Sequence, residues 1–386
     1  MKKIKWIMDN GLFIFFIGFW VLLGISILYI GWSKVWIYLY IPTMSPPFAD
    51  MRTVQSALEA TTQGLDPYIN NPSDPWRRVL NYPSVWLLIA NALNFGNDAY
   101  YLAFEILITL GYLVSCAMLL KKYPSFWLLL TMLSGSSLLG VERGNNDIFI
   151  FTLLYCSALA PLVWKALLIV VSITLKIYPL FAVISLAKHK KFFVAIICGA
   201  VVYFISVNDE LQKISSGLIS GPSLSYGLRN ISAWFMWAQK MSVNIWLIGA
   251  LLIIPPSICA IYFFKAEQLV PASQSSEEEI YLFLIGASIF IGTFVSASNF
   301  DYRLLFLSFC IPYILKTRFI VLRYLVPLAI VVATNQLYLE SQLQKTAIVI
   351  CIIAKCIAFV SIFFLFLLEL KKTAFNLKKI KSQSLK

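Results

Sequence analysis

Apolar runs of about twenty residues recur along the whole chain and constrain its fold more than any other feature. A run of that length is what a helix needs to cross the roughly 30 Å hydrocarbon core of a bilayer. Of the 386 residues, 60% are hydrophobic and only 13% are charged. A water-soluble domain of this length could not bury so much apolar surface. The sequence therefore predicts an all-α, polytopic transmembrane helix bundle.

Lysine and arginine residues gather in short hydrophilic breaks between the apolar runs. They lie at Lys2, Lys3 and Lys5, at Lys121 and Lys122, at Lys188, Lys190 and Lys191, at Lys316 and Arg318, and at Lys371, Lys372, Lys378, Lys379 and Lys381. The positive-inside rule assigns such breaks to the cytoplasm. The formal net charge of +13 thus indicates orientation in a bilayer and not a nucleic-acid partner.

The spacing of the apolar runs predicts about ten full crossings and one broken pair of half-helices, with both termini in the cytoplasm and residues 1–386 forming a single integral membrane domain. The run from Gly11 to about Ile41 is too long for a signal peptide, so we interpret it as an uncleaved first span. The other predicted crossings are 101–120, 126–139, 148–163, 192–207, 243–264, 280–295, 304–315, 319–333 and 347–368.

The segment 166–187 carries lysine at both ends and is interrupted by Lys176-Ile177-Tyr178-Pro179. A single span with positive charge at both ends would break the orientation rule, so we expect two half-helices that meet at Lys176. Irregular backbone at membrane depth must face protein or water, so this tip should line a cavity. The segments 42–98 and 208–242 are predicted to be the two large extracytoplasmic loops, the first with a helix near 49–63 and a juxtamembrane helix at 85–95, which is too short to cross the bilayer.

The predicted outer breaks hold charged and amide side chains at the ends of spans. The candidate site residues among them are Asp50, Arg143, Asn145, Asn146, Asp147, Lys176, Arg229, Asp301 and Arg303. Ionisable groups at membrane depth are costly and by default mark a functional site. Taken singly, each of these residues is equally well interpreted as an ordinary charged or polar side chain of a solvated loop. The gathering of the whole set on one face favours a site.

Asp50 directly follows Pro46-Pro47-Phe48-Ala49, a short and stiff connection after the first span. A carboxylate held at the membrane edge is suited to taking a proton from an acceptor hydroxyl. The alternative is structural, because Asp is also a favoured N-cap and a helix is expected to start near Met51. Position alone leaves both interpretations open.

Two further features are candidate sugar and phosphate ligands. In the turn 142–147, Gly144 permits the bend while amides and charges can bind hydroxyls or phosphate; an internal Glu–Arg or Asp–Arg pair is the alternative. Lys176 and Arg303 are cations at a membrane interface, suited to a phosphodiester and to charge on a departing phosphate. Arg303 has the alternative role of neutralising Asp301.

The sequence offers little support for nucleotide or metal chemistry. The glycine-punctuated segment 221–230 is not a P-loop, which argues against ATP or a nucleotide sugar. The single histidine, His189, lies in a lysine-rich break, and the seven cysteines fall in or beside apolar runs without metal-type spacing. We expect no organic cofactor, and a divalent metal ion is compatible with the chain but not indicated.

Four short motifs follow one another between about residues 40 and 310. They are Asp50 with Gly64-Leu65-Asp66-Pro67-Tyr68 and Tyr82-Pro83, then Gly144-Asn145-Asn146-Asp147, Lys176-Ile177-Tyr178-Pro179, and Asn299-Phe300-Asp301-Tyr302-Arg303. Their order and spacing resemble GT-C glycosyltransferases, and within them the polyprenol-phosphate-mannose-dependent mannosyltransferase family. Asn145 stands where that family usually has glutamine, and no second acidic residue is obvious beside Asp50.

The resemblance implies a GT-C-like fold in the plasma (inner) membrane and an active site on its extracytoplasmic side. It implies inverting transfer of a hexose from a polyprenyl-phosphate donor to a glycan or lipid acceptor. Asp50 would be the base, and the donor phosphate and sugar would be bound by Lys176, Arg303, Asp301, Tyr302, Arg143, Asn145, Asn146, Asp147 and Arg229.

Two other functions compete with this one. A polysaccharide polymerase or ligase usually concentrates arginines in large outer loops, whereas 208–242 has only Arg229, Lys213 and Lys240 as cations. A flippase or transporter of a lipid-linked saccharide tends to show duplicated halves with broken helices in matching positions. The chain has one broken pair and no evident duplication.

Overall fold

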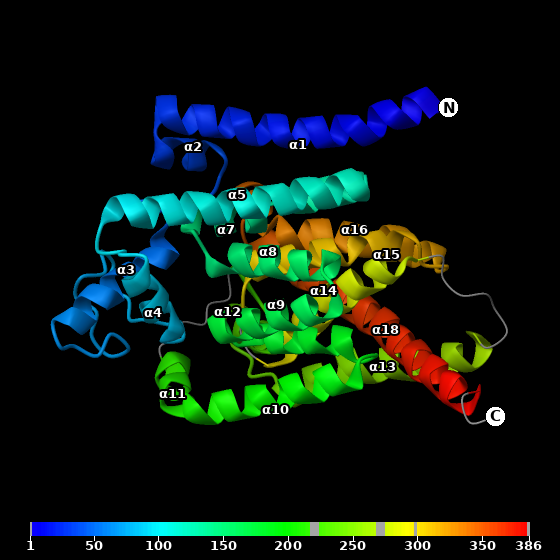
Figure 1. Cartoon of the computed structure of the whole chain (residues 1–386). Coiled ribbons are helices and arrows are strands. Elements are labelled where there is room, and N and C mark those ends of the chain that lie inside the picture. The colour runs from blue at the N-terminus through cyan, green and yellow to red at the C-terminus, as the bar shows by residue number, and fades with distance from the viewer. Residues whose placement is uncertain (1, 217–223, 268–274, 297–298, 384–386) are drawn as a thin grey trace. The chain divides into compact units, whose positions relative to one another are not determined.

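The computed structural model describes residues 2–216, 224–267, 275–296 and 299–383. Within them the chain is mostly helical, so the all-α prediction is confirmed (Figure 1). In the described part of the chain, five helices are long and apolar enough to cross a membrane, or up to seven if each of two bent helix pairs is one span. The chain is therefore a membrane protein, and the predicted total of ten crossings stays a prediction.

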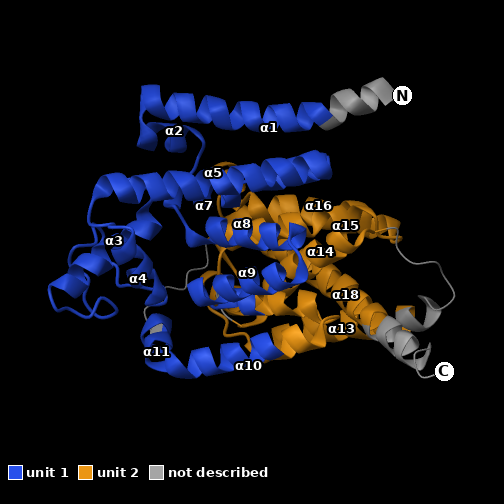
Figure 2. Ribbon diagram, in the orientation of Figure 1, with its two compact units in different colours: residues 1–180, 195–219 blue, residues 181–194, 220–386 orange. Residues whose placement is uncertain are grey.

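The chain divides into two compact units, coloured separately in Figure 2. The first comprises residues 1–180 and 195–219, and the second residues 181–194 and 220–386. The first unit holds α1 (Lys2–Ile30), α2 (Trp32–Tyr38), α3 (Ala49–Thr62), α4 (Val85–Ala92), α5 (Asp98–Lys122), α6 (Phe126–Met132), α7 (Gly135–Arg143), α8 (Asn146–Leu159), α9 (Leu162–Leu175) and α11 (Asn208–Ser216). The 3-10 helix η1 (Tyr178–Leu186) and α10 (Lys190–Ser206) are shared between the units.

Among its described residues, the second unit contains one short two-stranded pairing between segments far apart in the sequence. Its elements are β1 (Ser225–Tyr226), α12 (Leu228–Gln239), α13 (Ile245–Glu267), α14 (Glu277–Ser296), β2 (Asn299–Phe300), η2 (Asp301–Phe309), α15 (Ile311–Leu315), α16 (Ile320–Thr334), α17 (Gln336–Leu343) and α18 (Lys345–Gln383). The two strands are antiparallel, with Ser225 opposite Phe300 and Tyr226 opposite Asn299.

Several predicted spans are broken in the structure. The run 11–41 is interrupted at Gly31, whose φ is +96°, and the run 126–139 becomes α6 and α7 because Ser134 caps the second helix. The predicted span 304–315 is a 3-10 helix followed by the short α15. The break predicted at Lys176 is confirmed, since α9 ends at Leu175 and Pro179 lies at the start of η1.

In the first unit, α1 and α5 run side by side, and the segment joining them carries α3 and α4 (Figure 1). This segment therefore lies at one end of both helices. Met51, Val54 and Ala57 recur on α3 at helical spacing and are fully buried against α4. Trp86 of α4 donates its indole N–H to the carbonyl of Leu175 at 2.9 Å, which ties α4 to the end of α9.

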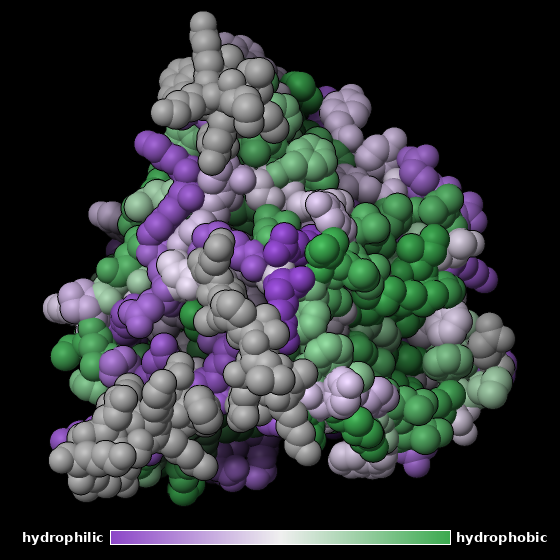
Figure 3. Space-filling view, turned by 90° about the vertical axis from the view of Figure 1, so that its right-hand side faces the viewer, coloured by the Kyte–Doolittle hydropathy of each residue, from purple (hydrophilic) through white to green (hydrophobic). Residues whose placement is uncertain are grey.

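Large apolar side chains lie exposed on the long helices, as lipid contact requires. Leu28 is 85% exposed and Trp246 is 82% exposed. On the face drawn in Figure 3, hydrophobic side chains cover broad areas and hydrophilic ones gather apart from them. Such surface would be unfavourable in water and is ordinary against hydrocarbon.

Candidate functional site

The turn between α7 and α8 is built by one glycine and one asparagine. Gly144 ends α7 with a φ of +58°, and a Cβ added there would lie 2.7 Å from the Cβ of Phe48. Glycine is thus required at this position because it tolerates the positive φ and because a larger side chain would clash with Phe48. Asn145 then caps α8, because its Oδ1 accepts the backbone N–H of Asp147 at 2.9 Å.

Asp50 meets this turn from the first turn of α3. Its Oδ2 accepts the Asn145 amide N–H at 2.6 Å, and its Oδ1 lies 3.3 Å from Nη1 of Arg78. Helix α3 begins at Ala49 with Phe48 as its N-cap, so Asp50 does not cap the helix and that alternative is wrong. The Asp50 side chain is 17% exposed, which leaves room for a hydroxyl to reach it.

Lys176 reaches the same turn from the break after α9. Its Nζ lies 2.6 Å from Oδ1 of Asp147 and 3.3 Å from Oδ1 of Asn145. Tyr178 donates its hydroxyl to the same Asp147 oxygen at 2.7 Å. Asp147 is fully buried whereas the Lys176 side chain is 13% exposed, so Lys176 is the more accessible member of the pair. One amide, Asn145, thus joins the carboxylate of Asp50 to this cation.

Arg78 is a residue of this site to which the sequence assigned no role. Asp74 is buried and holds the Arg78 guanidinium through Nε at 3.3 Å and Nη2 at 3.0 Å. Nη2 also donates to the carbonyl of Ala49 at 2.5 Å, and the guanidinium stacks over Trp76. These bonds fix the cation beside Asp50, where it can offset negative charge.

The Glu142–Arg143 pair has a structural role. Nη1 of Arg143 lies 2.9 Å from Oε2 of Glu142, which is the internal pair that the sequence left as an alternative. Oε1 of Glu142 accepts the backbone N–H of Met44 at 2.8 Å, so the buried carboxylate anchors the chain that leads to Asp50. Burial raises the pKa of Glu142, and the Arg143 charge and the Met44 N–H partly oppose that rise.

Two buried polar side chains at the turn between α7 and α8 make no hydrogen bond to another described residue. Glu105 of α5 is 1% exposed, neither carboxylate oxygen is bonded, and Oε2 lies against Gly144. Both amide atoms of the buried Asn146 are likewise unbonded. Glu105 interacts electrostatically with Asp50, so a second acidic group lies near it. A single carboxylate inside an apolar run was the available signal.

The remaining predicted residues belong to the second unit. Arg303 donates to the Asn299 side chain, Tyr302 stacks on Phe300 with ring centroids 5.4 Å apart, and Arg229 is exposed at the start of α12. Asn299 also donates to the carbonyl of Thr293 at 2.6 Å. Their role in binding a donor stays a prediction. Residues 221–223 of the glycine-punctuated segment lie outside the described residues.

Asp301 forms an ion pair with Lys355 of α18, and not with Arg303, which is the partner that the sequence left as an alternative. Lys355 Nζ lies 2.8 Å from Oδ1 and 2.9 Å from Oδ2 of Asp301, and it also donates to Gln336 at 2.6 Å and to the Ser225 carbonyl at 3.0 Å. Both ionic side chains are at most 3% exposed. Burial raises the pKa of Asp301, and the Lys355 charge opposes that rise.

The described residues contain no group of three or more His, Cys, Asp or Glu side chains that could hold a metal ion. The groups around Asp50 in the first unit include its carboxylate, the cations Arg78 and Lys176, and the Asn145 amide. Such a set can accept a proton and stabilise an anionic leaving group. Comparisons of the chain with protein-family models, curated proteins and solved structures found no match.

Proposed function

We propose that the protein is a GT-C-like membrane glycosyltransferase that transfers a hexose from a polyprenyl-phosphate donor to a glycan or lipid acceptor. The observation that carries the proposal is the hydrogen-bonded chain from Asp50 through Asn145 to Lys176. It sets a partly exposed carboxylate and a partly exposed ammonium on the two sides of one amide, at the end of α1 and α5. The lysine-rich breaks favour an extracytoplasmic site in the plasma membrane.

In the proposed reaction, the acceptor hydroxyl oxygen forms a bond to C1 of the sugar as the bond from C1 to the phosphate oxygen breaks. Asp50 takes the hydroxyl proton, and the polyprenyl phosphate leaves with the bonding electron pair. Asn145 orients the Asp50 carboxylate through its 2.6 Å bond. Lys176, held beside the turn by Asp147, offsets the negative charge that builds on the departing phosphate.

The test is transfer of radiolabelled sugar from synthetic polyprenyl-phosphate donors in membranes that contain wild-type protein or Asp50→Asn. Loss of a general base lowers rates by roughly 10²- to 10⁴-fold, so we expect a loss of at least about 100-fold at equal protein level. Asp66→Asn is the matched control. Asp66 lies in the same segment, its side chain is 36% exposed, and it makes no contact with Asp50.

Equal transfer by wild type and Asp50→Asn would remove Asp50 as the base. No transfer from any donor would instead favour a flippase, which would tolerate Asp50→Asn. Reconstituted liposomes with a fluorescent lipid-linked saccharide would then detect flipping directly. A ladder of products longer than one added sugar would indicate a polymerase.

A further inference from the structure

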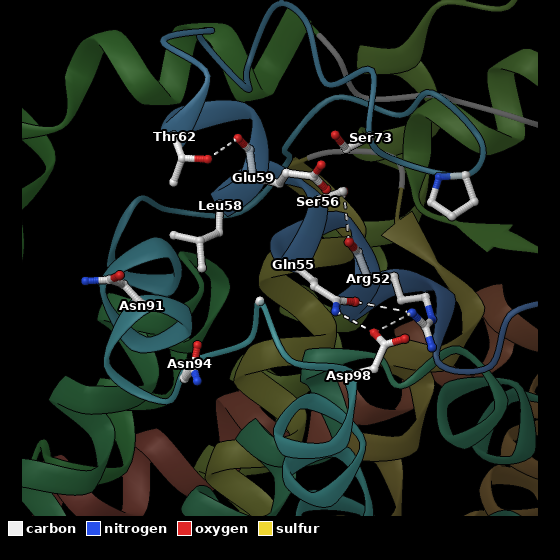
Figure 4. Close-up of a pocket in the computed structure, with 12 residues that line it drawn as sticks. Arg52, Gln55, Ser56, Leu58, Glu59, Thr62, Ser73, Asn91, Asn94 and Asp98 are labelled. Carbon is white, nitrogen blue, oxygen red and sulfur yellow. Dashed lines mark hydrogen bonds and ion pairs between the residues drawn. The ribbon is translucent and has the colours of Figure 1, made fainter.

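A polar cavity of about 470 Å³ opens in the first unit between α3, α4 and the start of α5 (Figure 4). Its volume lies within the range of small-molecule sites. The side chains that line it and carry the argument are Arg52, Gln55, Glu59, Asn91, Asn94 and Asp98. None of them belongs to the hydrogen-bonded chain around Asp50, so the cavity needs its own explanation.

One wall of the cavity is a fixed network. Gln55 Nε2 donates to Asp98 Oδ1 at 2.7 Å and to the carbonyl of Phe95 at 2.9 Å. Arg52 Nη1 donates to Gln55 Oε1 at 3.2 Å and lies 3.4 Å from the same Asp98 oxygen. These bonds hold the donors and acceptors in place before anything binds, which lowers the entropic cost of binding.

The opposite wall offers unused hydrogen-bonding groups. Asn91 and Asn94 lie at the end of α4, across the cavity from Arg52 and Asp98 in Figure 4. Both are exposed, and neither side chain makes a hydrogen bond to another described residue. An asparagine amide donates and accepts at once, so it can bind two neighbouring hydroxyls of a sugar ring.

We propose that this cavity binds the saccharide acceptor, a neutral and hydroxyl-rich ligand. The cavity has amides, carboxylates and one guanidinium, which suits hydroxyls that both donate and accept. The carboxylates of Glu59 and Asp98 outnumber the Arg52 cation, which disfavours a phosphate. The proposal rests on the proposed function, because a hydroxyl of the acceptor would have to reach Asp50. Arg52 and Asp50 both lie in the first turn of α3 but on different faces of it, so an acceptor held in the cavity would have to extend around that turn.

The experiment measures sugar binding directly and does not depend on transfer. Saturation-transfer difference NMR is recorded with methyl α-glucopyranoside, methyl α-galactopyranoside and methyl α-mannopyranoside on the full-length protein in nanodiscs, because glycosidic detergents would compete. The variant is Asn91→Ala with Asn94→Gly. Glycine is chosen at 94 because Asn94 has a φ of +54°, so removal of its amide adds no backbone strain.

Asn70→Ala is the control, since Asn70 is an exposed amide of the same segment that does not line the cavity. We expect at least one glycoside to bind wild type and the control equally. The double variant should bind it about tenfold more weakly, which corresponds to the loss of two hydrogen bonds. In transfer assays the acceptor KM should rise by a similar factor while the donor KM is unchanged.

Equal binding by wild type and the double variant would overturn the proposal, as would an absence of binding by all three glycosides to wild type. Binding that is lost in the double variant supports the cavity even if no donor gives transfer. In that case the proposed transferase fails and the saccharide site stands. A double variant that transfers with unchanged acceptor KM would separate the cavity from the reaction and overturn its role as acceptor site.

Discussion

Each unit contains a cluster of buried charge, and the two clusters are organised differently. In the second unit, Lys355 is enclosed by the Asp301 carboxylate, the Gln336 amide and the Ser225 carbonyl, and both ionic side chains are at most 3% exposed. In the first unit, the side chains of Asp50 and Lys176 remain 17% and 13% exposed. The enclosed cluster holds strands and helices together, whereas the open one keeps groups that a ligand can reach.

This difference teaches that charge inside a membrane protein is not by itself a sign of chemistry. Lys355 and Glu105 both satisfy the rule that an ionisable group in an apolar run marks a site. Lys355 proves to be fully bonded by its own chain, while Glu105 has no partner among the described residues. The unmet hydrogen-bonding capacity, more than the charge, separates the two cases.

The sharpest test applies one substitution in each unit. Asp301→Asn leaves the buried Lys355 without a counter-charge, which should lower the free energy of unfolding by about 3–5 kcal/mol. Asp50→Asn keeps an acceptor oxygen for Asn145 and should cost no more than about 1 kcal/mol. Chemical denaturation in mixed micelles, followed by tryptophan fluorescence, measures both values.

The double variant Asp301→Asn with Lys355→Met removes both charges together and should recover most of the stability lost by Asp301→Asn. If Asp50→Asn proves as destabilising as Asp301→Asn, the cluster of the first unit is structural and the distinction between the two clusters fails.

A smaller effect is expected at Asn145, where stability and activity should fall together. Asn145→Ala removes the cap of α8, which should cost about 1 kcal/mol of unfolding free energy, and it also removes the donor to Asp50. Asn145→Asp is the control, because it keeps the cap oxygen but cannot donate to Asp50. Unfolding and transfer are measured on the same preparations. Full activity in Asn145→Asp would show that the amide does not orient the base.

The smallest effect is expected at the exposed pair of Asp66 and Lys213, whose side chains are 36% and 42% exposed. The Lys213 hydrogen bond lowers the pKa of Asp66 below its ordinary 3.8. A lowered carboxyl pKa contributes stability above pH 3.8 that is lost as pH falls through the folded pKa. Lys213→Met removes this contribution at pH 7, but the loss should be small because the pair is exposed, and stability should then fall less steeply as the pH is lowered. The acid-unfolding midpoint measures this, and a large loss at pH 7 would contradict the ranking by burial.

The sequence predicts those parts of the fold and site that depend on local chemistry. The helix expected at 49–63 is found at Ala49–Thr62, and the break at Lys176 follows from Pro179. Asp50, Asn145, Asp147 and Lys176 were singled out individually and come together in one unit. Their partners Arg78 and Lys355 were not identified, because contacts between distant segments depend on packing that no local pattern encodes. The broken spans near Gly31 and Ser134 are not predicted by the length of the apolar runs, although both sites carry local signals, Gly-Trp-Ser-Lys at 31–34 and Ser-Gly-Ser-Ser at 134–137.

Asn145 uses its two amide atoms for different purposes, since the oxygen starts a helix and the nitrogen holds the carboxylate of Asp50. Folding and function therefore share a single side chain of four atoms at this turn. Under the proposed function, a selection for thermal tolerance at position 145 will also act on transfer, and the reverse also holds. Directed evolution of this protein would have to treat the position as fixed and look for robustness elsewhere.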